Sequence, residues 1–95
     1  IRDRLLRDDA DALDALAKEF WQQDRSLEVA PLVALPKAIR TRVLRLALFE
    51  SGVSQLSAEQ VAQVEALISN WKGQGEVSLP AGVKVSRISG RLTLS

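Results

Sequence analysis

The sequence predicts a mainly helical α+β domain, in which three helices form a core beside a small C-terminal antiparallel β-sheet. Apolar residues recur at helical spacing up to about residue 72, whereas from residue 76 onward apolar and polar residues alternate. The 95 residues are enough for one modest core. We therefore expect a single domain over 1–95, with a helical part at about 1–72 and a β-hairpin part at about 76–95.

The first predicted helix spans residue 2 to about residue 23 and is amphipathic. At about 100° per residue, its apolar side chains gather on one side and most of its charges on the other, as in a helix that packs on a protein surface. The apolar side consists of Leu5, Leu6, Leu13, Leu16, Ala17 and Phe20.

Asp9 points into this apolar stripe, where a carboxylate is costly unless it is paired. Two interpretations are open. Asp9 lies at the rim, where it reaches solvent or caps a neighbouring helix, or it forms an ion pair with Lys37 or Arg40 of the second helix. The ion-pair interpretation favours Arg40 and predicts that Asp9→Ala destabilises the protein more than Asp8→Ala or Asp11→Ala.

The second predicted helix begins at Pro36, where the missing N–H costs nothing, and runs to about Glu50. Gly52 is expected to be its left-handed cap. Before this helix, the alternation of Leu27–Val29 predicts a short strand that ends at Pro31.

The third predicted helix covers about 58–71 and has a clear start, because Ser57 and Gln60 match a capping box. Gly73 is expected to end it. Trp71 is interpreted as an anchor at the core or its rim rather than as a platform for base stacking. The predicted core of the three helices comprises Leu13, Leu16, Phe20, Ile39, Val43, Leu46, Val64 and Leu67.

The C-terminal tail has the period of two that is typical of strands, at 76–79, 83–88 and 92–94. Turn residues separate these segments, and the strand at 27–29 is able to extend the same sheet. The side chains expected to face the helices are Val77, Leu79, Val83, Val85, Leu92 and Leu94.

The composition leaves little material for catalysis or metal binding. The chain has no Cys and no His, which excludes disulfides, zinc sites of the usual kind, and thiol or imidazole catalysis. The Gly-rich segment 72–76 follows a helix and precedes a strand, the reverse of a phosphate-binding loop. We expect no catalytic, cofactor-binding or metal-binding residue here. With no long apolar run and no signal-peptide pattern, we also expect no membrane contact.

The second helix carries the one functional signal above background. Lys37, Arg40, Arg42 and Arg45 lie within three turns, and the next carboxylate is Glu50. A helix with several arginines and no acidic partner along its own face is a candidate phosphate-binding surface. We also expect Lys72 to contact a backbone phosphate. The alternative is a solvated basic face, or arginines that pair with acids of the first helix.

The order of these segments resembles the C-terminal part of tRNA(Ile)-lysidine synthases. The resemblance rests on RLLRDDADALDALA, then LPKAIRTRVLRLAL, then SAEQVAQVEALI, then EVSLPAGVKVSRISGRLTL, and covers essentially the whole chain. In that family the second helix typically begins with Leu-Pro and carries several arginines. Here this pattern matches Leu35, Pro36, Arg40, Arg42, Leu44 and Arg45.

The resemblance implies a fragment of a cytoplasmic ligase that uses ATP to join lysine to the wobble cytidine of an isoleucine tRNA. The family's Ser-Gly-Gly-x-Asp-Ser loop is absent from this sequence. The resemblance therefore places ATP and magnesium in an N-terminal catalytic domain of the same chain. For these residues it implies tRNA as the partner, with no cofactor. The RNA-binding residues would be Lys37, Arg40, Arg42, Arg45 and Lys72.

A protein-interaction or structural module is the alternative, in which the arginines pair within the molecule and an apolar rim docks on a neighbouring domain. DNA binding through a helix-turn-helix is disfavoured, because the segment Ser57–Trp71 contains two acids and no Arg, unlike a recognition helix.

Overall fold

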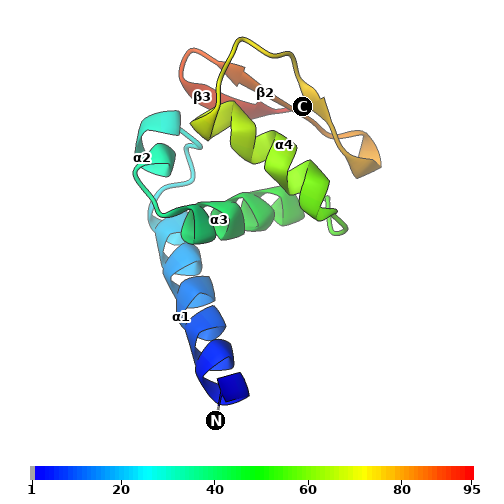
Figure 1. Cartoon of the computed structure of the whole chain (residues 1–95). Coiled ribbons are helices and arrows are strands. Elements are labelled where there is room, and N and C mark those ends of the chain that lie inside the picture. Colours follow the sequence, from blue (N-terminus) through cyan, green and yellow to red (C-terminus); the bar gives the residue numbers. More distant parts are fainter. Residues whose placement is uncertain (1) are drawn as a thin grey trace.

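The computed structural model describes the backbone of residues 2–95 and the side chains of residues 9–95. In this part of the chain, helices form the N-terminal body and an antiparallel sheet closes it, so the predicted fold class is confirmed (Figure 1). The elements are α1 (Arg2–Gln23), α2 (Val29–Val33), α3 (Lys37–Glu50), α4 (Ala58–Ser69), β1 (Val77–Ser78), a 3₁₀ turn (Pro80–Gly82), β2 (Lys84–Ile88) and β3 (Arg91–Leu94).

The helix α1 has the predicted bounds, and its first turns project beyond the body of the domain (Figure 1). Ala17 and Trp21 are buried, and they stand four residues apart on the face that meets α3. Leu16 was predicted in the core, yet it is 49% exposed, because it lies about 100° around the helix from Ala17. The predicted stripe residues Leu5 and Leu6 lie outside the described side chains.

The C-terminal end of α1 is tied to the end of α3 by Glu50. Its carboxylate accepts hydrogen bonds from the indole N–H of Trp21 and from Arg25, whose Nη1 lies 2.9 Å from Glu50 Oε1. The Arg25 guanidinium also lies 5.2 Å from the centre of the Trp21 ring. These contacts hold the pKa of Glu50 below its usual value, with the Trp21 hydrogen bond the largest cause and Arg25 the next.

Replacing Glu50 by glutamine should lower the stability of the fold near neutral pH and change it little in acid. A carboxyl whose pKa is lower in the folded state stabilises the fold above its unfolded pKa, and this contribution disappears as the pH falls through the folded pKa. Urea denaturation of parent and variant across this pH range measures the difference. A destabilisation of the same size at every pH would contradict this account.

The segment before α3 corrects a prediction. Glu28 forms a single antiparallel bridge with Arg91, as expected of a strand joining the sheet, but Val29 already begins the short helix α2. Pro31 lies inside this helix, in the first turn, where no intrahelical N–H partner is needed. Burial of Val29 and Leu32 then holds the segment against the domain.

Local signals set the ends of α3 and the start of α4. Gly52 follows α3 with a φ of 98°, as predicted for a left-handed cap. The capping box is present, since Ser57 Oγ accepts the Gln60 N–H at 3.1 Å and Gln60 Oε1 accepts the Ser57 N–H at 2.9 Å. The end of α4 was predicted too late, because Asn70 caps it before Gly73. Trp71 is a rim residue covered by the Arg87 guanidinium, 5.1 Å from its ring centre.

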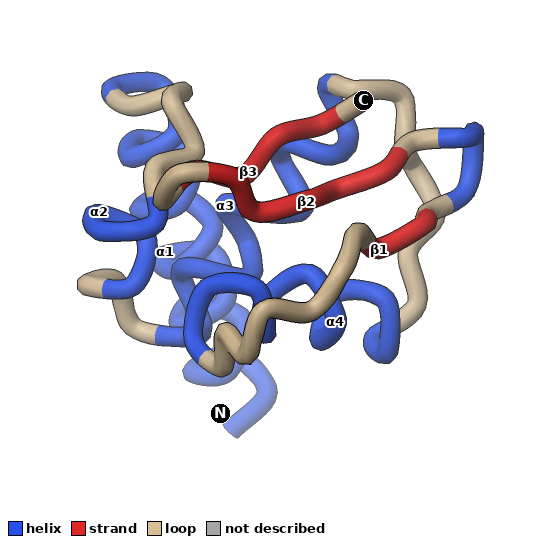
Figure 2. Tube along the Cα trace, turned by 90° about the horizontal axis from the view of Figure 1, so that it is seen from above, coloured by secondary structure: helices blue, strands red, loops and turns tan. Residues whose placement is uncertain are grey.

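The sheet has the order β1-β2-β3 and lies over α3 and α4, with α1 on the far side of α3 (Figure 2). Val85 of β2 faces Val77 of β1 and Leu94 of β3 in the register. The six predicted inward side chains of the tail are buried or pack on the core. Of the other predicted core residues, Val43, Val64 and Leu67 are buried, and Phe20, Ile39 and Leu46 pack against them. Leu13 is only half-buried and lies outside this cluster.

Candidate nucleic-acid interface

Four residues of α3 form one row along the outside of the helix. Lys37, Thr41, Arg45 and Phe49 follow each other at intervals of four, so their side chains lie one above the other. We call this row the outer ridge. Lys37, Arg45 and Phe49 are exposed, and the Thr41 hydroxyl donates to the Lys37 carbonyl at 3.1 Å. The ridge therefore presents two cations and an aromatic ring to solvent.

Arg40 is not available to RNA, which corrects its place among the predicted binding residues. It is 7% exposed and forms an ion pair with the buried Glu65 of α4, with 2.7 Å between Arg40 Nη2 and Glu65 Oε1. Its Nη1 donates to the carbonyls of Val33 and Leu35 at 3.2 and 3.1 Å. The other Glu65 oxygen accepts from Ser69 Oγ at 2.9 Å. Arg40 is thus a structural residue in a satisfied buried network.

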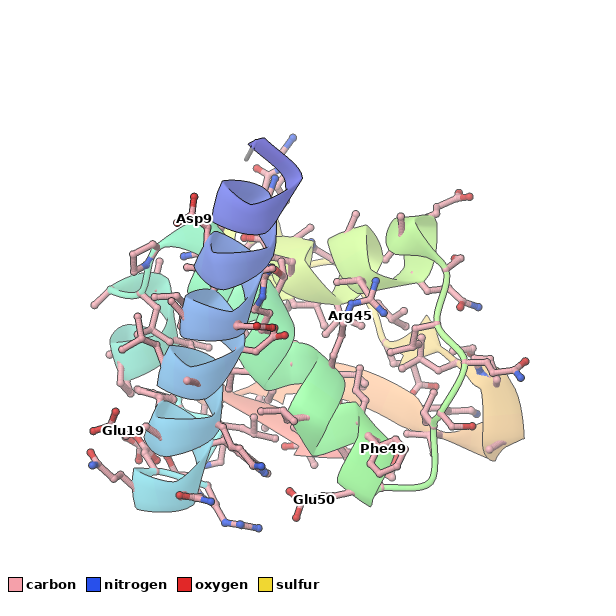
Figure 3. The ribbon with its side chains drawn as sticks, turned by 90° about the horizontal axis from the view of Figure 1, so that it is seen from below. Asp9, Glu19, Arg45, Phe49 and Glu50 are labelled. Atoms are coloured by element: carbon pink, nitrogen blue, oxygen red, sulfur yellow. The ribbon has the colours of Figure 1, made fainter. Side chains whose placement is uncertain are left out.

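The predicted pair of Asp9 with Arg40 is also wrong. Asp9 is exposed, and Figure 3 shows it on the side of α1 that is turned away from Arg45. Its position in the apolar stripe has no consequence in this chain because the first turns of α1 project beyond the body. The rim interpretation, with Asp9 reaching solvent, is the correct one.

Arg42 pairs with an acid of the first helix, which is the alternative that the sequence left open for the arginines of α3. Its Nε lies 2.7 Å from Asp14 Oδ1 of α1, and its Nη1 donates to the Ala38 carbonyl at 2.8 Å. The Arg42 side chain is 30% exposed and that of Asp14 is 65% exposed. Arg42 therefore links α1 to α3 at the surface, and its charge is already paired.

Lys37, Arg45 and Lys72 keep their charges open to solvent. No hydrogen bond or ion pair joins the charged group of any of the three to another side chain of residues 9–95. Lys72 lies in the loop after α4. Three of the five predicted binding residues, Lys37, Arg45 and Lys72, are thus exposed and keep an unpaired charge within residues 9–95.

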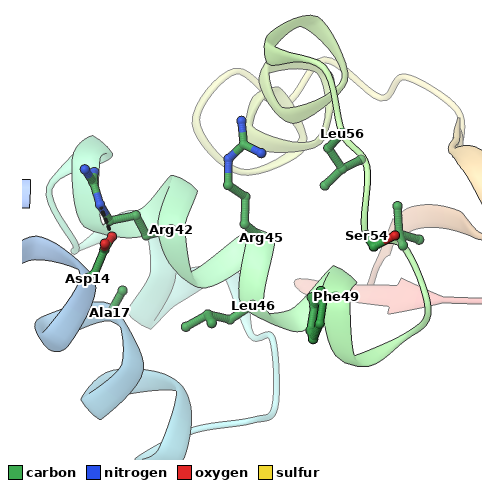
Figure 4. Close-up of a pocket in the computed structure, with 9 residues that line it drawn as sticks. Asp14, Ala17, Arg42, Arg45, Leu46, Phe49, Ser54 and Leu56 are labelled. Atoms are coloured by element: carbon green, nitrogen blue, oxygen red, sulfur yellow. Dashed lines mark hydrogen bonds and ion pairs between the residues drawn. The ribbon is translucent and has the colours of Figure 1, made fainter. Parts of the chain in front are cut away.

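A groove of about 340 Å³ lies beside the outer ridge, between α1, α3 and the loop 51–57 (Figure 4). Its cationic and aromatic side is formed by Arg42, Arg45 and Phe49, and its apolar lining includes Leu46, Val53 and Leu56. Sequence reasoning missed Phe49. Its signal was its place four residues after Arg45, on the same helical row.

The described part of the chain contains neither a cluster of metal-ligating side chains nor a helix that could span a membrane. Within residues 9–95, no three carboxylates gather where they could hold a metal ion. Over residues 2–95, no helix has the length and apolar character needed to cross a bilayer.

Two comparisons with known proteins, one with family models and one with curated sequences, point to the same family. Residues 27–93, from just before α2 to the end of the sheet, match the family model described as the TilS substrate binding domain. Similar curated proteins are tRNA(Ile)-lysidine synthases. That of Streptomyces coelicolor is 43% identical over 96% of this chain and 28% of its own length, and that of Thermobifida fusca is 42% identical over 96% and 30%. That of Leifsonia xyli is 46% identical over 93% and 29%. The chain thus spans less than a third of these relatives, and no solved structure matches it.

Proposed function

Because the chain belongs to the TilS substrate-binding domain family, we propose that it is a tRNA-binding domain of a tRNA(Ile)-lysidine synthase. In this proposal the intact enzyme is a cytoplasmic ligase that attaches lysine to the wobble cytidine of isoleucine tRNA. ATP and magnesium would bind in an N-terminal catalytic domain, and this domain would hold and position the tRNA. In this proposal the residues described here would take no part in the chemical step.

The observation that carries the proposal is the pair of open cations on the outer ridge. Lys37 and Arg45 are separated by eight residues, or roughly 12 Å along the helix axis. Neither pairs with another side chain of residues 9–95, whereas Arg40 and Arg42 do. An arginine fork and a lysine ammonium at this spacing suit two phosphates of one RNA backbone.

The acids of residues 27–95 support this reading, because three of the five are neutralised within that part of the chain. Over residues 27–95 the sequence has eight basic and five acidic side chains. Three of these acids pair within this part of the chain: Glu28 with Arg91, Glu65 with Arg40, and Glu76 with Lys84. The remaining positive charge lies largely on α3 and after α4, which favours attraction of a polyanion to that side.

Reversing Lys37 and Arg45 to glutamate in the intact protein tests the proposal. We expect weaker binding to every tRNA, and a slope of log affinity against log salt that is smaller by roughly two units, one for each lost phosphate contact. Both side chains are exposed, so the melting temperature should change little. Filter binding or fluorescence anisotropy at several salt concentrations gives both quantities.

The control reverses Lys18, an exposed lysine of α1 with no ion pair among residues 9–95, and is compared with the single reversals of Lys37 and of Arg45, which change the net charge by the same amount. Its salt slope should stay close to that of the parent. A Lys37/Arg45 variant that binds tRNA like the parent at all salt concentrations would contradict the proposal. It would favour the second candidate, a protein-interaction module, which the internal pairing of Arg40 and Arg42 and the exposed Leu16 support.

A further inference from the structure

We propose that the groove beside the outer ridge holds one unstacked nucleotide of the bound RNA, with its base on the Phe49 ring and its phosphate on Arg45. This inference rests on the proposed tRNA binding. It goes further, because it assigns Phe49 to stack on an unpaired base and Arg45 to bind the phosphate of the same nucleotide.

The exposure of Phe49 is the first observation. Its side chain is 65% exposed, the largest exposed fraction among the large hydrophobic residues described. Figure 4 shows the ring at the edge of the groove, on the same helix as Arg45 and one turn beyond it. Aromatic rings in this setting are the usual platforms for bases of single-stranded RNA.

The charge pattern of the groove is the second observation. Arg42 is paired with Asp14, so that this carboxylate, which also lines the groove, does not repel an anion as a free carboxylate would. Arg45 has no such partner among residues 9–95. The groove thus offers one open guanidinium beside a ring and an apolar lining, which matches a phosphate joined to a base.

The size and character of the groove favour a nucleotide over a protein segment. Its volume of about 340 Å³ is at the lower end of the range for small-molecule sites. An apolar protein segment that covered it would remove water from the Arg45 guanidinium without supplying an anion, which is costly. A base in a continuous helix has both faces occupied, so a base that stacks on Phe49 must come from a loop, bulge or end.

The test replaces Phe49 by leucine in the intact protein, which removes the aromatic face and keeps an apolar side chain. We expect tRNA affinity to fall roughly fivefold to a hundredfold, the range for loss of one base–aromatic stack. The salt slope should stay unchanged, because stacking releases no counterions. Phe49→Trp should keep or increase the affinity. Ile88→Ala, at an exposed apolar residue of β2, is the control and should bind like the parent.

The outcomes separate this inference from the proposed function. If Phe49→Leu binds tRNA like the parent while the Lys37/Arg45 reversal weakens binding, the nucleotide groove is wrong and the basic ridge stands. If Phe49→Leu lowers the melting temperature of the intact protein and leaves tRNA affinity unchanged, the groove is a protein contact and the inference is overturned. If the parent itself binds no tRNA, both fail.

Discussion

Replacing Glu65 by alanine should lower the free energy of unfolding by about 3–5 kcal/mol, because it leaves the Arg40 guanidinium buried without a counter-charge. Arg40 and Glu65 are 7% and 6% exposed, and their ion pair joins α3 to α4 through the interior. The carbonyl oxygens of Val33 and Leu35 would still accept hydrogen bonds from Arg40, but they carry no charge to neutralise its guanidinium. Urea denaturation monitored by circular dichroism measures the loss.

Two further variants identify the cause of this loss. Glu59→Ala removes an exposed acid from the first turn of the same helix, where a favourable interaction with the helix dipole is worth about 0.3–1 kcal/mol, so its effect should be small. The double variant Arg40→Met/Glu65→Leu removes both charges and should recover part of the stability. A Glu65→Ala protein as stable as Glu59→Ala would show that the pair contributes nothing.

The buried pair also explains why Arg40 and Arg45 should behave differently in binding experiments. Arg40 holds the linker between α2 and α3 through two carbonyls and therefore positions the start of the outer ridge. Its replacement should lower stability before it lowers tRNA affinity. Replacing Arg45, whose side chain is exposed, should lower tRNA affinity and leave stability unchanged.

Much of the fold could be predicted because local signals define it. The period of α1, the proline before α3 and the capping box before α4 each act within a few residues along the chain, and the helix starts agree with the structure to within one residue. The change to a period of two predicted the sheet and its inward side chains.

The helix α2 could not be predicted in this way. Five residues are too few to show a helical period, and Leu27-Glu28-Val29 at its start alternates as a strand does. What stabilises α2 is burial of Leu32 against residues that are distant in the sequence, with contacts to α4. Tertiary packing therefore decides its conformation, and local preference does not.

The candidate site shows the same division between local and distant causes. The row of cations on α3 could be predicted from spacing, but their partners come from other elements: Glu65 for Arg40 and Asp14 for Arg42. Glu65 stands in an apolar stripe just as Asp9 does, between Val64 and Ile68. A search of the sequence for acids inside apolar stripes would have found both Asp9 and Glu65, and Glu65 is the acid that pairs with Arg40. Only the packing of α4 in the core distinguishes them.

Leu32→Ala should be the second strongly destabilising change, with a loss of about 2–5 kcal/mol from reduced burial and the cavity left behind. Leu32 is fully buried, whereas its neighbour Val33 is 49% exposed, so Val33→Ala is a matched control that should stay within about 0.5 kcal/mol of the parent. A shift of the urea midpoint at constant slope would identify a change in stability.

The two losses should not add fully, because Leu32 and Glu65 support the same junction. Leu32 anchors α2, and the Val33 carbonyl at the end of α2 accepts from Arg40, the partner of Glu65. Once α2 is loosened by Leu32→Ala, part of what Glu65→Ala removes is already gone. The double variant Leu32→Ala/Glu65→Ala should therefore lose less than the sum of the single variants, by about 0.5 kcal/mol or more. Strict additivity would show that α2 and the buried pair stabilise the fold independently, and that the start of the outer ridge does not depend on α2.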